Sequence, residues 1–520
     1  MKNPLNNFPA HTEKEKAEII ANHFETQFKL NNFGTASTEN TVSKSIKKFF
    51  THSPTPTYEK VKASEIADYL KKIKIKKAPG IENITNKMLK NLPLKIILKL
   101  ANLYNNMFKL NHFPGCWKTG RILPILKLGK DPTQPISYRP ISLLATLSKL
   151  SEKIILNRYI KHAKKVRIPI PQQFGFTPQL STTHQLLRVT EHILESKFAN
   201  LATAAIFLDI AKAYDKVWTQ GLIHKLIAYK FPHYIISIIH SYLQDRQFVV
   251  KVKNTDSSPR NIHAGMPHGG ILASIIFLCF MNDIPQQKDI TLSLYADDTA
   301  ILAQGKKFNT ISNSLSKYIP KLESWLKRWK IQLNVEKTEA IIFSKYFKHC
   351  PEIKIYSTPV PWKKEIKYLG VILDRNLTFR PHLNHIKEKY NKAFRAQYSL
   401  ICRNSRISIQ NKLLIYQAYL RPILTYASPV WAFTAKSNFN IIQVLENKTI
   451  RMIMQADWHI RNADIRKSTN IPSLKDFIIK LSDKFYNNLS QIDNTAISNI
   501  PSYDSSHEKF RKRPRAMLCT

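Results

Sequence analysis

The sequence predicts an α+β protein in which a central unit of mixed helices and strands lies between helical flanks. Apolar runs of strand length, such as 204–208 and 339–343, alternate with segments of helical period, such as 315–329. From residue 382 to 485 the apolar period is almost wholly helical. The chain has 520 residues, of which 43% are hydrophobic, so it has enough apolar material for more than one packed core. An α+β layering is the simplest arrangement of such elements.

The first 150 residues predict a leader, then helices, then strands. Residues 1–56 are polar and end in the breaker run SPTP, which predicts a helix over 13–28 followed by a linker. Apolar residues then recur at helical spacing from 61 to 110. Four prolines between 117 and 150 predict short strands and loops in that stretch.

The remaining elements follow from the helical period of 3.6 residues and the strand period of 2. They are expected in the order helix 180–194, strand 204–208, amphipathic helices 214–243, strand pair 248–262, helix 271–281, strand pair 292–302, helix 315–329, strands 339–343 and 368–373, and helices 382–485 with breaks at Pro422 and Pro429. Four regions result, namely 1–56 (polar leader and linker), 57–120 (helical extension), 121–380 (mixed unit) and 381–520 (helical region with a basic tail).

The charge of the chain indicates a polyanionic partner. Eighty Lys and Arg residues face 36 Asp and Glu, which gives a net charge of +44. A protein this basic repels itself unless a polyanion neutralises it, so nucleic acid is the leading partner and an anionic membrane surface the weaker one. Scattered solvated lysines would account for part of the excess. The longest apolar stretch, 271–281, is about half of the roughly 20 residues that a membrane span needs, so we expect no membrane segment.

The cysteines and the N-terminus predict an intracellular protein. The five cysteines are far apart, and no C-x-x-C pair or Cys/His cluster occurs, which excludes a readable disulfide framework or zinc knuckle. Residues 1–10 lack the apolar core of a secretory signal peptide.

Three aspartates form the strongest candidate site. Asp297 and Asp298 lie between two apolar runs, as at the tip of a β-hairpin, and Asp209 follows an apolar strand directly. Taken singly, the Asp-Asp pair is as well explained by an ordinary turn, and Asp209 by a helix N-cap. Together they bring three carboxylates to one edge of a sheet, where hard oxygen ligands favour Mg²⁺. Two such ions, with Mn²⁺ as an alternative, would catalyse phosphoryl transfer.

Nine motifs make the sequence resemble the reverse transcriptases of non-LTR (LINE-type) retrotransposons, most of all the jockey-like elements. In chain order they are KAPG at 77–80, FPGCWK at 113–118, SYRPISLL at 137–144, QFGF at 173–176, FLDIAKAYD at 207–215, AGMP at 264–267, YADD at 295–298, LNVEKT at 333–338 and YLG at 368–370. One motif alone would be weak, but nine in the family's order are not coincidental.

The resemblance implies a right-hand polymerase with fingers and palm in 121–380 and a thumb in 381–520. It implies an RNA-directed DNA polymerase that extends a DNA 3′ end on an RNA template by two-metal phosphoryl transfer. The expected partners are the RNA template, the DNA primer or target and deoxynucleoside triphosphates. The expected location is the nucleus and cytoplasm, as a ribonucleoprotein. Rivals are a group II intron-type reverse transcriptase, a viral RNA polymerase, or a decayed element copy that binds nucleic acid without polymerising.

The resemblance also implies roles for the acids and for one lysine. Asp209 and Asp297 would hold both metal ions, with Asp298 beside them. Lys337 would protonate or neutralise the leaving pyrophosphate, although a solvated loop lysine is the ordinary alternative. Leu369 and Gly370 would lie at the primer grip, where a plain strand glycine is nearly as good an explanation.

Five further positions are implied to bind the nucleotide. Tyr214 would exclude a ribose 2′-hydroxyl by its bulk, or else it packs in the core. Lys127 and Arg139 would contact the triphosphate, or else they are surface charges. His268 and Gly269 stand where the family has Gln-Gly. Histidine can still donate one hydrogen bond there, with a different reach.

The departures from the family pattern are His268, Thr177 and Gln179, and they favour the decayed-copy alternative. Because only about 56 polar residues precede the first segment that resembles a reverse transcriptase, too few for a second core, we expect the endonuclease of such elements to be supplied separately. Two basic regions are ambiguous. Residues 389–406 place aromatic side chains among Lys and Arg, which suits either nucleic-acid binding or a core. The cluster 509–515 suits a targeting signal, a nucleic-acid patch or a solvated tail.

Overall fold

The computed structural model of the chain describes residues 1, 9–51, 57–344, 351–501, 503 and 513–519. These residues form two compact units, each assembled from three segments. Unit 1 comprises 1–170, 210–285 and 321–333, and unit 2 comprises 171–209, 286–320 and 334–520. Helices and sheets are mixed in both units, which confirms the predicted α+β class. None of the described helices is both long and apolar enough to cross a membrane.

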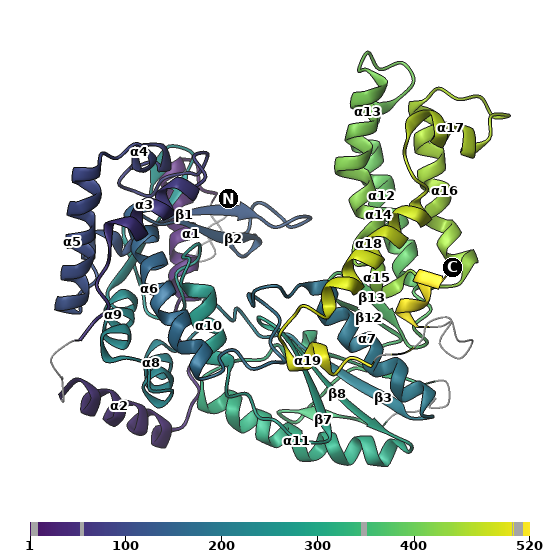
Figure 1. The fold of residues 1–520 in the computed structure, drawn as a ribbon. Coiled ribbons are helices and arrows are strands. Elements are labelled where there is room, and N and C mark those ends of the chain that lie inside the picture. Colours follow the sequence, from purple (N-terminus) through teal and green to yellow (C-terminus); the bar gives the residue numbers. More distant parts are fainter. Residues whose placement is uncertain (2–8, 52–56, 345–350, 502, 504–512, 520) are drawn as a thin grey trace. The chain divides into compact units, whose positions relative to one another are not determined.

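Unit 1 is a five-stranded sheet surrounded by helices (Figure 1). Its strands are β1 (Thr119–Leu126), β2 (Tyr138–Leu143), β4 (Arg246–Val252), β5 (Thr255–Asp256) and β6 (Arg260–Ile262). Its helices are α1 (Glu13–Gln27), α2 (Ala36–Thr51), α3 (Ala63–Lys72), α4 (Asn86–Lys90), α5 (Leu94–Leu110), α6 (Thr146–Lys165), α8 (Thr219–Ala228), α9 (His233–Leu243) and α10 (Ala273–Met281), with 3-10 turns at η1 (Gly115–Trp117) and η2 (Pro135–Ser137). Strand β1 pairs antiparallel with β2 and parallel with β4.

The N-terminal helix is part of the core of unit 1. Thr12 caps α1 through a capping box with Glu15. Helix α1 packs on β4. The ring of Phe28, at the end of the helix, lies edge to face against the ring of Phe248, with centroids 5.3 Å apart. The predicted leader helix is therefore present. The predicted linker after it is corrected in part, because Ala36–Thr51 form α2, which packs on α8.

Unit 2 contains a four-stranded antiparallel sheet in the order β7-β8-β3-β9, followed by a helical region (Figure 1). Its strands are β3 (Ala202–Leu208), β7 (Ile290–Tyr295), β8 (Asp298–Gly305), β9 (Glu339–Phe343), β10 (Lys354–Ile355), β11 (Thr358–Pro359), β12 (Glu365–Tyr368) and β13 (Val371–Asp374). Its helices are α7 (Thr182–Phe198), α12 (Arg380–Ile401), α13 (Ile409–Ile415), α14 (Arg421–Thr425), α15 (Ser428–Trp431), α16 (Lys436–Ile453), α17 (Asn462–Thr469), α18 (Leu474–Leu489) and α19 (Thr495–Ser498), with shorter turns at η3 (Val335–Lys337) and η6 (Pro514–Cys519).

Strand β3 is the buried centre of unit 2. All seven of its residues are buried, which explains why its sequence is a continuous apolar run and does not alternate. Helix α7 packs against β3 and β7. Helix α11 (Phe308–Arg328) contains the boundary between the two units, at Pro320.

Of the two helix breaks predicted in the C-terminal half, one is wrong and one is confirmed. Pro422 does not break the helical path, because α13 continues through a π-helical stretch, η4 (Tyr416–Leu420), directly into α14. Proline has no N–H and cannot make the usual i→i−4 hydrogen bond, and the π-helical stretch lies directly before it. The break near Pro429 is confirmed, since Ala427 adopts a left-handed conformation just before α15.

The basic tail is not simply solvated. Arg513 is buried and its guanidinium pairs with the Glu191 carboxylate on α7, which also accepts a hydrogen bond from Tyr503. The part of the predicted cluster from 509 to 512 lies outside the described residues.

Candidate active site

The three aspartates are gathered at one end of the unit 2 sheet by strand pairing. β3 and β8 are antiparallel neighbours, and Leu208 pairs with Thr299. Asp209 follows Leu208 directly in the sequence, and Asp298 precedes Thr299 as the first residue of β8. Asp209 and Asp298 therefore lie side by side. Strand β7 pairs Tyr295 with Asp298, which leaves Asp297 in the two-residue turn of the hairpin. The predicted Asp-Asp hairpin and strand-end aspartate are both present in the fold.

The hairpin tip is held by a buried glutamine from the QFGF motif. Ala296, the first residue of the turn, has φ +58, a conformation that normally favours glycine. The Gln173 Oε1 accepts hydrogen bonds from the Ala296 and Gly175 backbone N–H groups, both at 2.8 Å. A side chain on Gly175 would collide with the Ala296 backbone. The motif therefore packs its backbone directly under the turn that carries Asp297.

The LNVEKT motif fixes Asp209 in a similar way. The Asn334 N–H donates to the Asp209 carbonyl at 2.8 Å, and the Asp209 N–H donates to the Thr338 hydroxyl at 3.4 Å. Thr338 is fully buried and its hydroxyl donates to the Asn334 carbonyl. The Lys337 Nζ lies 4.0 Å from the Asp209 Oδ2 on a side chain that is 70% exposed. An ion pair that exposed contributes little stability.

The acids repel one another. Partial burial, together with the carboxylates of Asp297 and Asp209, raises the pKa of Asp298 to about 6. Burial also raises the pKa of Asp297, with Asp209 adding to the effect. A divalent cation would relieve this repulsion, and three carboxylates are the donors that Mg²⁺ prefers. Across the described ranges, no three His, Cys, Asp or Glu side chains are gathered closely enough to hold an ion as they stand.

The five nucleotide-binding candidates lie in unit 1, on the β1–β2 hairpin and on two loops. Arg139 of β2 is exposed and pairs with Ile125 of β1. The Lys127 Nζ donates to the Ile136 carbonyl at 2.7 Å, which folds this lysine back onto its own hairpin. Arg139 is therefore the more available of the two cations for an incoming phosphate.

Tyr214 lies against the AGMP motif. Its ring stacks on Phe277 of α10 with centroids 4.3 Å apart, and its carbonyl accepts from the Met266 N–H at 2.8 Å. Gly265 has φ +91, and a side chain there would strike the Tyr214 and Asp215 carbonyls. Tyr214 as a residue is half-buried, and its hydroxyl oxygen is buried.

His268 is tied to a partner that the sequence analysis did not single out. The imidazole Nε2 hydrogen-bonds to the Asp215 Oδ1, and the other oxygen of Asp215 accepts from the Gln27 amide at 2.6 Å. Asp215 could have been found, because it is the second acid of the FLDIAKAYD motif. Gln27 carried no such signal, since it lies on α1, 188 residues earlier in the sequence.

The loop that carries His268 and Gly269 is anchored by a buried acid. The Glu152 carboxylate of α6 accepts from the Ile271 N–H at 2.7 Å and the Leu272 N–H at 3.2 Å. Glu152 is fully buried, and burial raises its pKa. Gly269 has φ +79, and its position close to the Ser142 carbonyl leaves no room for a side chain. Sequence reasoning missed Glu152, which looks like any helix glutamate.

Gly370 occupies a turn position that requires glycine. Leu369 and Gly370 both have positive φ, and they form the tight turn between β12 and β13. The Tyr426 ring covers Gly370, and its hydroxyl donates to the Leu369 carbonyl at 2.8 Å. The hairpin geometry explains this glycine locally, and its expected place at a primer grip stays a prediction.

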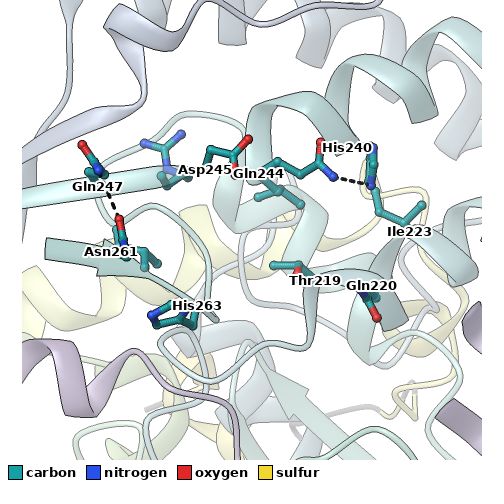
Figure 2. Close-up of a pocket in the computed structure, with 12 residues that line it drawn as sticks. Thr219, Gln220, Ile223, His240, Gln244, Asp245, Gln247, Asn261 and His263 are labelled. Carbon is teal, nitrogen blue, oxygen red and sulfur yellow. Dashed lines mark hydrogen bonds between the residues drawn. The ribbon is translucent and has the colours of Figure 1, made fainter.

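Unit 1 also contains a polar cavity of about 470 Å³ that lies apart from the predicted residues (Figure 2). Its lining consists of Thr219, Gln220, Ile223, His240, Leu243, Gln244, Asp245, Arg246, Gln247, Asn261, Ile262 and His263. The amides partly satisfy one another, through Gln247–Asn261 at 3.1 Å and Gln244–His240 at 3.0 Å. None of the nine predicted site residues lines it, so the chemistry proposed from the sequence does not use this cavity.

Comparison with known proteins is consistent with these features. Residues 127–373 match the family model described as "Reverse transcriptase (RNA-dependent DNA polymerase)". The chain is 33% identical over 499 residues, 94% of its length, to the RNA-directed DNA polymerase from mobile element jockey of Drosophila melanogaster, and covers 54% of that protein. It is 34% identical over 490 residues, 92% of its length, to the probable RNA-directed DNA polymerase from transposon BS of the same species, again covering 54%. The chain thus spans about half the length of the curated relatives it matches.

Proposed function

Because residues 127–373 of this chain belong to the reverse transcriptase family, we propose that it is an RNA-directed DNA polymerase of a non-LTR retrotransposon. The reaction would extend a DNA 3′ end on an RNA template, with deoxynucleoside triphosphates as substrates. The observation that carries the proposal is the set of three aspartates on paired strands, two of them with raised pKa values.

The right-hand division of such polymerases gives each region a proposed role. Residues 121–380 would supply the fingers and palm, and 381–520 the thumb. The four-stranded sheet of unit 2 has the acids at one end, as a palm requires. The helices from Arg380 to Leu489 are numerous and basic enough to contact a nucleic-acid backbone.

The acids would hold two Mg²⁺ ions, or Mn²⁺ in their place. When bound, such ions lower the pKa of a 3′-hydroxyl and neutralise charge on the leaving pyrophosphate. Asp209 and Asp297 would be shared ligands, and Asp298 an additional one. Strand pairing sets the relative position of these carboxylates, and the Gln173 and Thr338 hydrogen bonds restrict their movement. Lys337, 4.0 Å from Asp209, would donate a proton to the pyrophosphate or balance its charge.

Unit 1 residues would select and orient the nucleotide. Arg139 and Lys127 would contact the triphosphate, and Tyr214 would exclude a 2′-hydroxyl by its bulk. Gly269 would let the backbone approach the substrate. His268 would take the place of the family's glutamine, and its bond to Asp215 sets its orientation.

Primer extension on an RNA template tests the proposal. We expect wild-type protein to extend an annealed DNA primer in Mg²⁺, and Asp209→Asn to reduce extension to background. Asp289→Asn is the matched control, because this exposed acid lies in unit 2 just before β7. Equal extension by wild type and Asp209→Asn would refute the metal-ligand assignment, and no extension by wild type would refute the polymerase.

One observation favours the alternative of a decayed copy that binds nucleic acid without polymerising. The His268 side chain is held by Asp215, so it has one ring nitrogen left for a nucleotide. The same extension assay distinguishes the two functions. The separately supplied endonuclease and the nuclear and cytoplasmic ribonucleoprotein remain predictions. Plasmid nicking by the purified protein would contradict the first, and imaging of the tagged protein tests the second.

A further inference from the structure

Among the described residues, the second most exposed large hydrophobic side chain is a tryptophan at one end of the helical region of unit 2. Trp458 is 91% exposed and lies in the connection between α16 and α17. Its indole ring lies beside the ring of the exposed His459, with centroids 6.0 Å apart. A single exposed aromatic side chain is common on protein surfaces, so the case for a ligand rests on the two loops around Trp458 and on their charge.

The loop that presents Trp458 is rigid. The Arg451 guanidinium donates to the Asp457 carbonyl at 2.5 Å, to the Ile460 carbonyl at 2.7 Å and to the Asn462 side chain at 3.0 Å. These bonds lie on both sides of Trp458 in the sequence. The indole is therefore held out on a braced loop, which lowers the entropy that a ligand must overcome to bind it.

A second loop lies beside the first and is basic. Residues 402–408 connect α12 to α13, and they exchange hydrogen bonds with the Trp458 loop, from Gln455 to the Arg403 carbonyl at 3.2 Å and from Arg403 to the Ala456 carbonyl at 3.3 Å. The buried Lys412 braces this loop through the Cys402 carbonyl at 2.7 Å. Figure 1 shows the α12–α13 connection and α17 at the same end of the helical region.

The charge of this end suits a polyanion. Arg403 and Arg406 in the 402–408 loop are exposed, as is Arg461, three residues after Trp458, and Asp457 is the exposed acid next to Trp458 in the sequence. Between residues 380 and 469 the chain has fifteen Lys and Arg against four Asp and Glu. An exposed indole on one loop, hydrogen-bonded to a second loop that carries exposed arginines, has the composition of a surface that stacks a base and binds a phosphate backbone.

We propose that residues 402–406 and 455–461, here called the tip surface, bind an unpaired strand of nucleic acid outside the polymerase site. The Trp458 indole stacks on one base, and Arg403, Arg406 and Arg461 contact the adjacent phosphates. The ligand is a single strand, since a base within a duplex has its faces covered by its neighbours. This site does not require the polymerase activity proposed above.

The test measures binding of short fluorescent oligonucleotides to the full chain in EDTA, where no metal-dependent reaction occurs. RNA and DNA single strands and a matched duplex are separate arms. Trp458→Ala should weaken single-strand binding about tenfold, whereas Trp458→Phe should keep most of it, because a phenyl ring still stacks. Tyr356→Ala, an exposed aromatic in the turn between β10 and β11, is the matched control and should bind like wild type.

Salt dependence separates stacking from phosphate contact. Arg403→Ala should flatten the slope of log K against log salt by about 0.7, the value for one phosphate of a single strand, and Trp458→Ala should leave the slope unchanged. Lys306→Ala, an exposed cation elsewhere in unit 2, should change neither. The melting temperature of Trp458→Ala should equal that of wild type, since Trp458 is 91% exposed, whereas Arg403→Ala also loses the hydrogen bond to the Ala456 carbonyl and should melt slightly lower.

Wild-type affinity in Trp458→Ala would overturn the proposal, as would an equal loss for duplex and single strand. Preference between the RNA and DNA arms tells which strand is bound, and either result supports the site. Repeating the titration with Asp209→Asn separates the two proposals. Persistent dependence on Trp458 in that variant supports the tip surface even if primer extension fails in every protein.

Discussion

The two units fix their candidate site residues by different means. In unit 2 the three aspartates are positioned by backbone pairing of β3, β7 and β8, with Gln173 and Thr338 hydrogen-bonded to backbone N–H groups beside them. In unit 1 three of the nucleotide-binding candidates, Tyr214, His268 and Gly269, lie on loops where side chains from distant segments, such as Gln27 and Glu152, make the supporting hydrogen bonds. A metal site tolerates little displacement, and a sheet provides that rigidity, whereas a substrate pocket on loops can adapt.

This contrast predicts that changes to the acids of unit 2 remove activity without destabilising the fold. Asp297→Asn should reduce primer extension to background, because a metal ligand and its charge are lost together. Its melting temperature in metal-free buffer should equal or exceed wild type, since one of three repelling carboxylates is neutralised. Thermal unfolding in EDTA, measured beside extension in Mg²⁺, checks both. A strongly destabilised Asp297→Asn would mean that the acid is structural.

The next largest effect should come from the support of the hairpin tip. Gln173→Leu leaves the buried N–H groups of Ala296 and Gly175 without their acceptor, which should cost about 1–3 kcal/mol of unfolding free energy. Activity should fall by roughly 10–100-fold, the usual range for a residue that orients metal ligands. Gln286→Leu, at an exposed position of unit 2, is the matched control. Full activity in Gln173→Leu would show that strand pairing alone positions Asp297.

In unit 1 the loss of a supporting hydrogen bond should change the KM for deoxynucleotides and leave Mg²⁺ binding unchanged. Gln27→Ala removes the buried amide that donates to Asp215, a charged-group hydrogen bond worth about 1.5–3 kcal/mol. We expect KM for deoxynucleotides to rise several-fold while the Mg²⁺ concentration needed for half activity stays constant. Lys29→Ala, an exposed neighbour, is the control. A changed Mg²⁺ requirement would show that the two units are not independent in this respect.

The smallest predicted effect is on stability as a function of pH. The folded-state pKa of Asp298 is raised to about 6 from 3.8, so the folded protein binds more protons than the unfolded chain between these values. Metal-free stability should therefore fall as pH rises from about 4 to 6. Mg²⁺ needs the carboxylate form, so its stabilisation, about 1.4 kcal/mol at ten times Kd, should be full near pH 7.5 and fade below about pH 6.

Melting curves with Mg²⁺ and with EDTA at each pH would show this as a shift of a few degrees that is present at pH 7.5 and absent at pH 5. Asp209→Asn should weaken the shift at every pH, because a proposed Mg²⁺ ligand is lost. A shift that persists unchanged at pH 5 would place the Mg²⁺ site away from these acids.

Much of the fold could be predicted because its patterns are local. The apolar run before Asp209 and the hairpin around Asp297 are visible within about ten residues, and both are strands in the structure. Helix α2 was missed because its sequence is polar over most of its faces, with Val42 its single buried residue. Pro422 was expected to end a helix, and the π-helical stretch before it shows how a helix can absorb a proline.

The resemblance to reverse transcriptases, the grouping of three acids at one end of a sheet and the order of most strands and helices could be predicted from the sequence, because each depends on residues that are neighbours or lie at a fixed period. The distant side chains that support these acids and loops are visible only in the folded chain. Gln27 donates a hydrogen bond to Asp215, and Glu152 accepts hydrogen bonds from the loop that follows His268. Arg513, in the basic tail, forms an ion pair with Glu191. The residues of each pair lie more than one hundred positions apart in the sequence. No regular spacing links residues at such a separation, so their pairing could not be inferred from the sequence. The exposed Trp458 belongs to the same class, since only folding shows which aromatic residues the core has left in water.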